Sequence, residues 1–539
     1  MSTSTHVTSS GGETVAPGSL AGNGRLGRAA GRGPAPGRGR PAPSEHVHIA
    51  IAGTGFAGLG MAIRLKQAGI HDFVLLERAR DVGGTWRDNS YPGCQCDVPS
   101  HLYSFSFAPN PDWSRTYSRQ PEIWEYLRRC AQEFGIVPHI RYDHEVQMAE
   151  WIEDERRWRI QTPSSTLTAD IIVSGVGALS EPSIPAIPGL ADFQGKVFHS
   201  AAWDHGHDLQ GKRVASIGTG ASAIQYVPRI QPEVDRLYVF QRTPAWILPH
   251  TDRPVSRLER RLYRALPALQ RLVRRGIYWG REWLVLGLTG HRALMRLPAQ
   301  IGRRHLRHQV ADPDLRARLK PRYQVGCKRI LISNDFYPAL TQPNVELVTD
   351  GIREIRAHSI VTTDGAEREV DTIIFGTGFH VTDMPVAERV RGRDGRTLDE
   401  IWQGSPEAYL GTTITGFPNF FMLLGPNTGL GHTSVVFMIE AQVAYVMDCL
   451  RAMDARGLGT VEVRPEVQAA FNRETQAQLR RTVWNAGGCA SWYIDANGRN
   501  STLWPDFTWR YRQRTARFDL RDYVAEPSRT APAGVPAAA

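Results

Sequence analysis

Apolar and polar residues are arranged in blocks that twice predict a strand, a glycine-rich turn and a helix. In the first block, HVHIAIAGTGFAGLGMAIRL, an apolar strand ends at Ala52 and a helical pattern follows. The turn between them contains Gly53, Gly55 and Gly58, which permit a tight bend, close approach of a pyrophosphate and close packing of helix on strand. The next apolar strand is followed by Glu77, whose carboxylate can accept hydrogen bonds from both hydroxyls of a ribose.

The second block, KRVASIGTGASAIQYVPRI, repeats the pattern over residues 218–223, and its first glycine lies 165 residues after Gly53. The same offset from Glu77 leads to Arg242. An acid at this place suits a free ribose hydroxyl, whereas arginine suits a 2′-phosphate. The register therefore predicts one FAD-type and one NADP-type site. Two glycine turns that bind nothing are the alternative, which the complete context of each turn disfavours.

Three further segments shape the expected fold. Residues 170–189 and 371–379 are short β-branched strands that run into Gly-X-Gly, and we interpret them as strand ends where the chain crosses between the two units, with ordinary sheet edges as the alternative. The Arg-rich block 253–320 has apolar residues at helical spacing and predicts several helices. We favour a helical insertion there, with a basic amphipathic helix on a membrane surface as the alternative.

Composition limits the function classes. The chain has 539 residues, 41% of them hydrophobic, and a net charge of +10. The arginines cluster in the first 45 residues and in 253–322, and neither cluster is interleaved with aromatics in the manner of a groove for single-stranded nucleic acid, so phosphorylated cofactors explain them as well as nucleic acid does. The Gly/Pro/Ser/Arg-rich leader is expected to be disordered. The most apolar helical run, 276–290, is too short to span a bilayer.

The six cysteines form no CxxC pair, so we expect no metal site and a reducing, cytoplasmic setting. A disulfide reductase needs a redox cysteine pair beside its flavin. The one-residue gap between Cys94 and Cys96 would make a strained disulfide, which disfavours that class. Electrons delivered to the flavin are then expected to pass to an outside acceptor, most simply O2.

The segment FQGKVFHSAAWD (193–204) is too polar for a core strand and opens like a loop. It resembles the fingerprint of the type I Baeyer–Villiger monooxygenases, whereas related N-hydroxylating and flavin-containing monooxygenases have Tyr at the place of Trp203. Residues 83–107 and 482–511 also resemble this family, and matching motifs cover about 46–515. The fingerprint residues are Phe193, Gly195, His199, Trp203 and Asp204.

The resemblance implies an FAD- and NADPH-dependent enzyme that converts a ketone to an ester or lactone with O2, through a flavin C4a-peroxide. It also implies that the fingerprint couples cofactor movement to oxygenation; a buried structural role is the simpler interpretation of His199. The alternatives are a flavin monooxygenase that oxidises nitrogen or sulfur, which Trp203 disfavours, and a non-catalytic flavin-binding redox sensor. The segment 425–436 departs from better-known relatives in a loop expected to contact the flavin ring, so the preferred ketone stays open, as does the oligomeric state.

By the same resemblance, Arg329 and Asp97 are the expected catalytic residues. A fixed guanidinium stabilises an anionic oxidant and the oxyanion that follows, and a carboxylate beside it holds the arginine in place. A solvated surface charge is the alternative for Lys328 and Arg329. The first cofactor site is expected to contain Gly53, Gly55, Phe56, Ala57, Gly58, Glu77, Gly83, Gly84, Thr85, Trp86, Asp97, Tyr103 and Val435, and the second Gly218, Thr219, Gly220, Ala221, Ser222, Ala223, Arg242, Thr243 and Lys328. Arg329, the expected active-site arginine, is also expected to contact a cofactor.

The predicted fold is α/β with two Rossmann-like dinucleotide-binding domains, the NADPH domain nested in the FAD domain and carrying the helical insertion. The expected boundaries are a leader at 1–45, FAD domain at 46–180 and 381–525, NADPH domain at 181–252 and 321–380, helical subdomain at 253–320, and a disordered tail at 526–539. The expected partners are a small ketone and O2, without nucleic acid and without stable membrane insertion.

Overall fold

The computed structural model describes residues 45–529. The ends of this range differ slightly from the expected leader and tail. Glu45 opens strand β1, and Glu526 and Pro527 close strand β20 (Tyr523–Pro527), which pairs with β19 (Leu458–Val463). The rest of the predicted leader and the tail from residue 530 lie outside the described residues.

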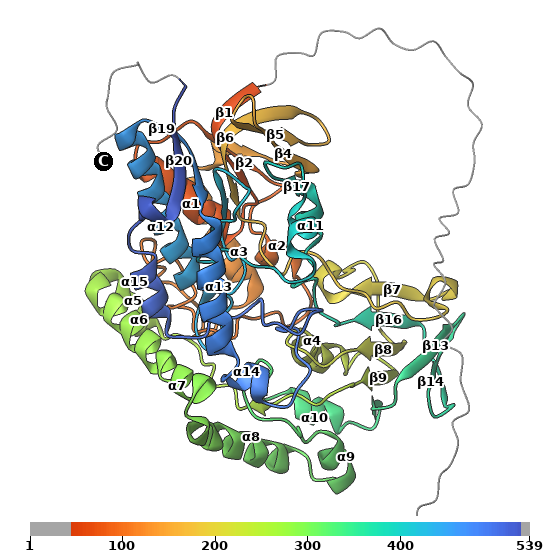
Figure 1. The fold of residues 1–539 in the computed structure, drawn as a ribbon. Helices are drawn as coiled ribbons and strands as arrows, with labels where there is room; N and C mark the ends of the chain where they lie inside the picture. Colours follow the sequence, from red (N-terminus) through yellow and green to blue (C-terminus); the bar gives the residue numbers. More distant parts are fainter. Residues whose placement is uncertain (1–44, 530–539) are drawn as a thin grey trace, which may run out of the picture. The chain divides into compact units, whose positions relative to one another are not determined.

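The first glycine turn belongs to an eight-stranded mixed sheet (Figure 1). Helix α1 (Phe56–Gln67) connects two of its parallel strands, β1 and β2, and packs against helix α12 (Val435–Arg456). All four residues of β2 are buried, as expected for a strand covered on both faces. The strand order is β17 (Val390–Arg391), β4 (Met148–Ile152), β5 (Arg157–Gln161), β6 (Thr166–Ser174), β1 (Glu45–Ala52), β2 (Phe73–Leu76) and β3 (Ile140–Arg141), with β18 (Phe420–Met422) also paired to β6.

The second glycine turn belongs to a separate five-stranded parallel sheet, where it joins strand β8 to helix α4 (Ala223–Ile230). In the chain, this sheet lies between β6 and β18 of the first sheet, so the second unit is nested in the first. The predicted α/β class with two Rossmann-like units is confirmed. The strand order is β12 (Val345–Val348), β9 (Arg236–Phe240), β8 (Arg213–Ile217), β16 (Thr372–Phe375) and β7 (Lys196–His199).

Strand β7 corrects the expectation of a loop across 193–204. Residues 196–199 pair in parallel with β16 at the edge of the second sheet. The polar residues led to the prediction of a loop, but a strand at the edge of a sheet needs to bury only part of its surface. Here Lys196 is exposed, whereas Phe198 and His199 are buried.

The Arg-rich block forms helices, as predicted, and they follow one another in green along the lower left of Figure 1. A capping box between Ser256 and Glu259 begins the first of them. After the last helix, strand β11 (Leu331–Ile332) pairs with β10 (Ile247–Leu248), which fixes the position of the preceding Lys328 and Arg329. The helices are α5 (Arg257–Ala265), α6 (Pro267–Glu282), α7 (Leu284–Thr289), α8 (Arg296–Gln309) and α9 (Pro313–Arg318).

The remaining elements complete the two units. They are α2 (Thr85–Asp88), α3 (Gln120–Glu133), α10 (Phe336–Leu340), β13 (Ile352–Arg356), β14 (Ser359–Thr362), β15 (Glu367–Glu369), α11 (Leu398–Trp402), α13 (Pro465–Leu479), α14 (Val483–Ala486) and α15 (Thr508–Arg514). Within residues 45–529, no helix is both long enough and apolar enough to cross a membrane.

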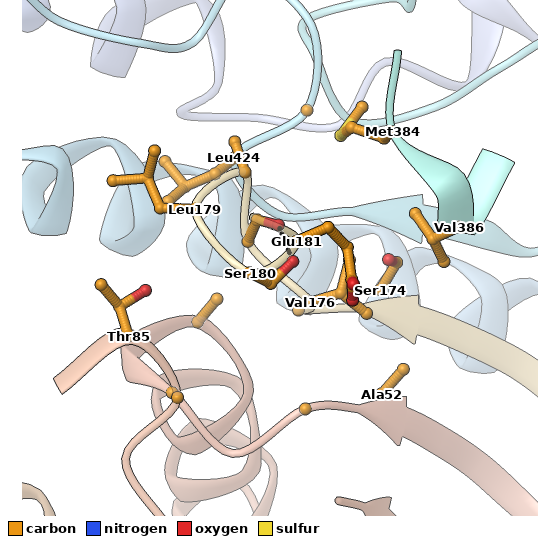
Figure 2. A pocket seen from close by; sticks show the side chains of 18 of the residues that line it. Ala52, Thr85, Ser174, Val176, Leu179, Ser180, Glu181, Met384, Val386 and Leu424 are labelled. Carbon is orange, nitrogen blue, oxygen red and sulfur yellow. Dashed lines mark hydrogen bonds between the residues drawn. The ribbon is translucent and has the colours of Figure 1, made fainter. Parts of the chain in front are cut away.

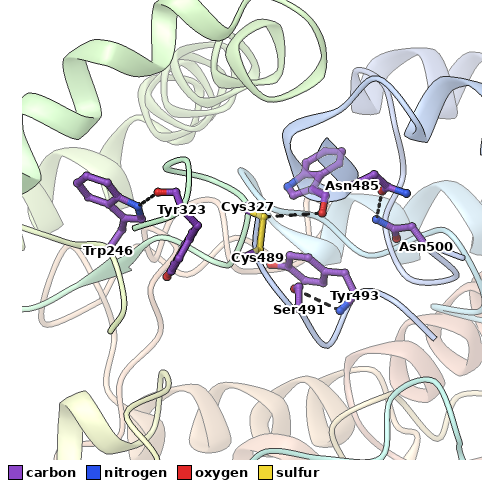
Figure 3. The surroundings of a disulfide bond; sticks show 9 residues. Trp246, Tyr323, Cys327, Asn485, Cys489, Ser491, Tyr493 and Asn500 are labelled. Carbon is purple, nitrogen blue, oxygen red and sulfur yellow. Dashed lines mark hydrogen bonds between the residues drawn. A yellow bond between two sulfur atoms is a disulfide. The ribbon is translucent and has the colours of Figure 1, made fainter. Parts of the chain in front are cut away.

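A disulfide joins Cys327 to Cys489, and Figure 3 shows its surroundings. The cysteine spacing did not predict this bond, because its two residues are 162 apart in the sequence. The bond ties the segment just before Lys328 to the loop after α14, within a buried cluster that includes Trp484 and Tyr493. The finding departs from the expectation of a fully reduced protein.

Candidate active site

A cavity of about 330 Å³ opens at the carboxyl ends of β1, β2 and β6. Parallel α/β sheets commonly bind their ligands at this edge. The turn at residues 53–57, the segment 83–87 and the crossover 174–181 all contribute to its walls. Figure 2 shows part of this lining, with Leu179, Ser180 and Glu181 on the crossover and Thr85 on the facing segment.

The first glycine turn leaves backbone open to the cavity. Gly53 has a φ of +92°, which favours glycine, and a Cβ atom on Gly58 would lie 1.9 Å from the Gly53 carbonyl oxygen. Helix α1 therefore packs directly on the turn. Gly55 caps this helix without a side-chain hydrogen bond, so the first backbone N–H groups of α1 remain available to a ligand. This cradle fits a pyrophosphate.

Glu77 lies at the end of β2, lines the cavity and is only 3% exposed. Its carboxylate accepts hydrogen bonds from Thr54 N at 3.0 Å, from Thr54 Oγ1 at 2.6 Å and from Ala79 N at 3.0 Å. Arg87 Nη1 donates to Glu77 Oε1 at 2.9 Å. The sequence predicted the acid but missed Arg87, which neutralises it.

Asp97 and Arg329, which are 232 residues apart in the sequence, form a bidentate ion pair. Arg329 Nε and Nη2 each lie 2.6 Å from an Asp97 oxygen. The charge of Asp97 raises the pKa of Arg329 above its ordinary value. Burial alone would raise the pKa of Asp97, but the charge and hydrogen bonds of Arg329, together with the charge of Arg281, outweigh burial and lower it. Both groups are therefore charged, and the guanidinium of Arg329 lines the cavity in a fixed orientation.

Aromatic side chains form the wall between the first turn and Arg329. Trp86 Nε1 donates to the Tyr103 hydroxyl at 3.1 Å, and the Phe56 ring lies edge-on to the Tyr103 ring at 5.2 Å. Burial raises the pKa of Tyr103, so its phenol stays protonated. Most of the predicted first-site residues line the cavity, whereas Gly58 and Asp97 lie behind it. Those lining it are Gly53, Gly55, Phe56, Ala57, Glu77, Gly83, Gly84, Thr85, Trp86, Tyr103 and Val435, and Arg329 lines the cavity with them.

The predicted second site lies outside this cavity. Gly218 begins its turn with a φ of +110°, and a Cβ atom there would lie 2.4 Å from the Gly376 carbonyl oxygen. Burial and the nearby charge of Arg242 both lower the pKa of Lys328, so these two cations lie close together. Arg242 itself is exposed. The consecutive residues Lys328 and Arg329 thus belong to two different sites: Lys328 lies near Arg242, and Arg329 lines the cavity. The other predicted residues here are Thr219, Gly220, Ala221, Ser222, Ala223 and Thr243.

The fingerprint residues do not line the cavity. His199 Nδ1 accepts a hydrogen bond from Ala201 N at 3.1 Å, and burial lowers the pKa of His199 to about 4. Trp203 packs against Phe198 and Tyr226. The other three fingerprint residues make contacts around strand β7. Phe193 packs against a buried apolar cluster, and Asp204 pairs with Lys196 at 2.5 Å. A Cβ atom on Gly195 would lie 2.4 Å from the Asp371 carbonyl oxygen.

The crossover after β6, which the sequence predicts as a passage between the two units, also forms a wall of the cavity. Arg78 Nη2 donates to Ser180 O at 2.9 Å, and Arg78 also pairs with Glu181. The signal that could have identified this wall is the Gly-Val-Gly sequence at 175–177, directly after a buried strand. Gly425, Thr428 and Leu430 of the unusual 425–436 loop also line the cavity, as that loop's expected place near the flavin requires.

The sequence and the fold are similar to those of known flavin-dependent oxidoreductases. A family model described as pyridine nucleotide-disulphide oxidoreductase matches residues 50–269. A Baeyer–Villiger monooxygenase of Streptomyces coelicolor is 56% identical over 486 residues, covering 90% of this chain and 93% of that protein. Cyclohexanone monooxygenase from Rhodococcus sp. Phi1 bound to NADP+ matches with a TM-score of 0.81 and 30% identity, over 90% of this chain and 100% of that one. OTEMO in complex with FAD and NADP matches with a TM-score of 0.80 and 27% identity, over 89% and 99%.

The fold and site define a flavoprotein that uses FAD and a nicotinamide coenzyme. The chain belongs to the Baeyer–Villiger monooxygenases. It is thus an oxidoreductase that uses NADPH and O2 to convert ketones to esters or lactones. Cys94 and Cys96 agree with this class rather than with a disulfide reductase, because both are free, buried thiols. Burial raises the pKa of Cys94 to about 12 and also raises that of Cys96.

Proposed function

We propose that Arg329 is the catalytic cation of this monooxygenase and that Asp97 is its positioning residue. The single observation that carries the proposal is the bidentate pair between them, with the guanidinium on the cavity wall. Because an arginine held by a carboxylate cannot be deprotonated at any working pH, its charge faces the reacting atoms permanently. Such a cation stabilises negative charge that develops on oxygen, without reorganisation.

The cavity supplies the remaining requirements for FAD. The backbone N–H groups at the start of α1 would hold its pyrophosphate, and Glu77 would accept from the adenosine ribose. When bound, FAD takes two electrons from NADPH and activates O2. Arg242 and Lys328 would hold the 2′-phosphate of NADPH outside the cavity. We further propose the internal domain boundaries stated above, at residues 180, 252, 320 and 380.

The substrate is a ketone small enough to reach Arg329, and its class is open to direct assay. A panel of cyclic, linear and aryl ketones, with one sulfide included, would identify it through NADPH consumption and product analysis. Cytoplasmic location also stays a proposal. The Cys327–Cys489 bond is unusual for a reducing compartment. Non-reducing mass spectrometry of protein alkylated inside intact cells would show which state exists there.

Arg329→Ala tests the catalytic assignment. The variant is expected to bind FAD and to be reduced by NADPH at the wild-type rate, because hydride transfer creates no anion beside residue 329. Its oxygenation rate is expected to fall about 100- to 1,000-fold. Arg329→Lys is expected to restore little, because an ammonium cannot form the planar two-point contact with Asp97.

Arg242→Ala is the matched control, since it is expected to impair reduction by NADPH and to leave oxygenation of the reduced enzyme intact. Stopped-flow absorbance separates the two half-reactions, and product is measured in parallel. Near wild-type ester yield per NADPH in Arg329→Ala would show that Arg329 has no catalytic role. Loss of reduction in that variant would instead assign Arg329 to the nicotinamide.

A further inference from the structure

The helical block carries most of the large apolar side chains that face solvent. Fifteen large hydrophobic residues are exposed within 45–529, and ten of them lie between 258 and 301. Trp279 is 52% exposed and Trp283 is 68% exposed. Isolated surface leucines need no explanation, but a concentration of this kind marks an interaction site.

Helix α6 shows how this surface is organised. Leu272, Trp279 and Trp283 are separated by seven and four residues, a spacing that places them on one side of the helix and its continuation into α7. Gly276 and Gly280 lie between them, and a Cβ atom on either glycine would contact nothing within 4 Å. This side therefore faces open space. We call these five residues the outer side of α6.

The opposite side of α6 is anchored to the rest of the protein. Gln270, Tyr278 and Glu282 are its buried residues. Gln270 Nε2 donates to Asn110 O at 2.6 Å, and the hydroxyl of Tyr278 lies 3.0 Å from Thr508 Oγ1. Because the inner side already has its partners, the exposure of the tryptophans is not a sign of incomplete packing.

Charge is concentrated on the same block. Residues 257–309 contain thirteen arginines and no lysine, against two glutamates and no aspartate, which gives +11. The whole chain carries +10, so all other residues together carry −1. The two acids are engaged locally: Glu259 pairs with Arg253 at 2.7 Å, and Glu282 accepts from Thr508 Oγ1 at 2.7 Å.

Two arginines flank the outer side of α6 without partners. Arg271 and Arg275 are exposed, and neither makes an ion pair or hydrogen bond within residues 45–529. Arginines beside exposed tryptophan and leucine are typical of helices that lie in the interface of an anionic bilayer. The tryptophan ring suits the boundary between headgroups and hydrocarbon, and the guanidinium suits lipid phosphate.

We propose that the outer side of α6, with Arg271 and Arg275, is a docking surface for anionic lipid membranes. A second copy of the chain fits less well, because contact through this block would bring two surfaces of +11 together. A nucleic acid would match the charge but would leave the leucine and tryptophans in water. Docking is peripheral, since no helix within 45–529 can span a bilayer.

Vesicle flotation with the full-length, FAD-loaded protein tests the proposal. The probes are vesicles of phosphatidylcholine alone and of phosphatidylcholine mixed equally with phosphatidylglycerol. The wild type is expected to float only with the anionic vesicles, and less so in high salt, which shortens the Debye length to about 3 Å at 1 M. Arg271→Gln with Arg275→Gln is expected to weaken binding about 25-fold, from roughly fivefold for each charge near an anionic surface.

A second pair of substitutions separates apolar insertion from charge alone. Trp279→Ser with Trp283→Ser is expected to weaken binding on the order of tenfold or more while flavin content stays unchanged. Arg80→Gln with Arg451→Gln removes the same charge from exposed arginines elsewhere, with side chains 90% and 67% exposed, and is expected to float like the wild type.

Three outcomes would overturn the proposal. The first is a wild type that does not float with anionic vesicles. The second is an unchanged affinity in the tryptophan pair, which would reduce the surface to nonspecific attraction of polyanions. The third is self-association of the wild type that the tryptophan pair dissolves, which would make a second copy the occupant.

Discussion

The two nucleotide units share the same strand–turn–helix pattern. They differ in whether the charged residue that follows the pattern is buried and neutralised before a ligand binds. In the first, Glu77 is 3% exposed and accepts four hydrogen bonds, one of them from Arg87. In the second, Arg242 is exposed and interacts electrostatically with Lys328, which is also a cation. The same strand–turn–helix frame therefore supports a closed, neutralised site and an open, positively charged one.

This difference matches the two kinds of cofactor. A resident group such as FAD benefits from a site whose charges are balanced before it binds, because no buried charge is then left alone. A coenzyme that leaves in every turnover needs an accessible site. Two adjacent cations repel each other until a phosphate dianion arrives, so the second site gains its electrostatic balance from the ligand.

The largest effect is expected when the carboxylate of Glu77 is removed from the first unit. Glu77→Ala removes the predicted ribose acceptor and one of the two carboxylates that pair with Arg87, since Asp88 still accepts from Arg87 Nε at 2.7 Å. We expect about 1.5–3 kcal/mol lower stability, the usual contribution of a hydrogen bond to a charged group, and protein that purifies without FAD. Flavin absorbance per protein and thermal unfolding measure both effects. Glu77→Gln, which keeps the shape, is the milder control, and full flavin content in both variants would contradict the assignment.

The second prediction concerns the open site. Arg242→Gln is expected to lower kcat/KM for reduction by NADPH about 10- to 100-fold, since a hydrogen bond to a charged group contributes about 1.5–3 kcal/mol. The value for NADH and the FAD content should not change. Arg80→Gln, at another exposed arginine, is the control. An equal loss with both coenzymes would show that Arg242 does not meet the 2′-phosphate.

Sequence reasoning located both turns because their chemistry is local. Gly53, Gly58 and Gly218 are each required by a close backbone approach within their own unit. The pairing of Asp97 with Arg329 could be inferred only from the family resemblance, since 232 residues separate them. Nothing local indicated that Arg87 neutralises Glu77. That contact depends on the path of the chain after the strand, which the apolar pattern does not specify.

The pH dependence of coenzyme binding gives a smaller and sharper test. Burial and Arg242 lower the pKa of Lys328 from 10.5, so in the free enzyme the lysine loses its proton at a lower pH than in the unfolded chain. Folding therefore carries an electrostatic cost that is full below the folded pKa and falls to zero as the pH rises from the folded pKa to the unfolded value near 10.5. NADPH binding has the opposite pH dependence: it weakens as the pH rises, because the 2′-phosphate is bound by the charged form of Lys328.

We expect the KM for NADPH to rise severalfold as the pH increases through the pKa of Lys328. In Arg242→Gln, one cause of the lowered pKa is gone, so the rise should move to higher pH. Stopped-flow reduction across the alkaline range measures it, with Lys328→Gln as the control that should lack the rise. The same midpoint in wild type and Arg242→Gln would show that the two cations do not interact.

The smallest effect is expected from the leader. Deleting residues 1–44 should leave FAD content, coenzyme preference and activity unchanged, because a Gly/Pro/Ser/Arg-rich segment contributes no core. A deletion that continues through residue 52 also removes β1, an inner strand of the first sheet that pairs with both β6 and β2, and should yield no soluble flavoprotein. Loss of flavin in the shorter deletion would show that the leader contributes to the first unit.

The bond between Cys327 and Cys489 fixes an order of events during synthesis. Cys489 is added 162 residues after Cys327. At about 5 to 20 residues per second, the growing chain carries Cys327 as a thiol for roughly 10 to 30 s. All strands of both nucleotide-binding sheets have been made by then. The covalent link two residues before Arg329 can therefore form only after every strand of the two sheets has been synthesised, and a chain that terminates before residue 489 leaves Cys327 without its partner.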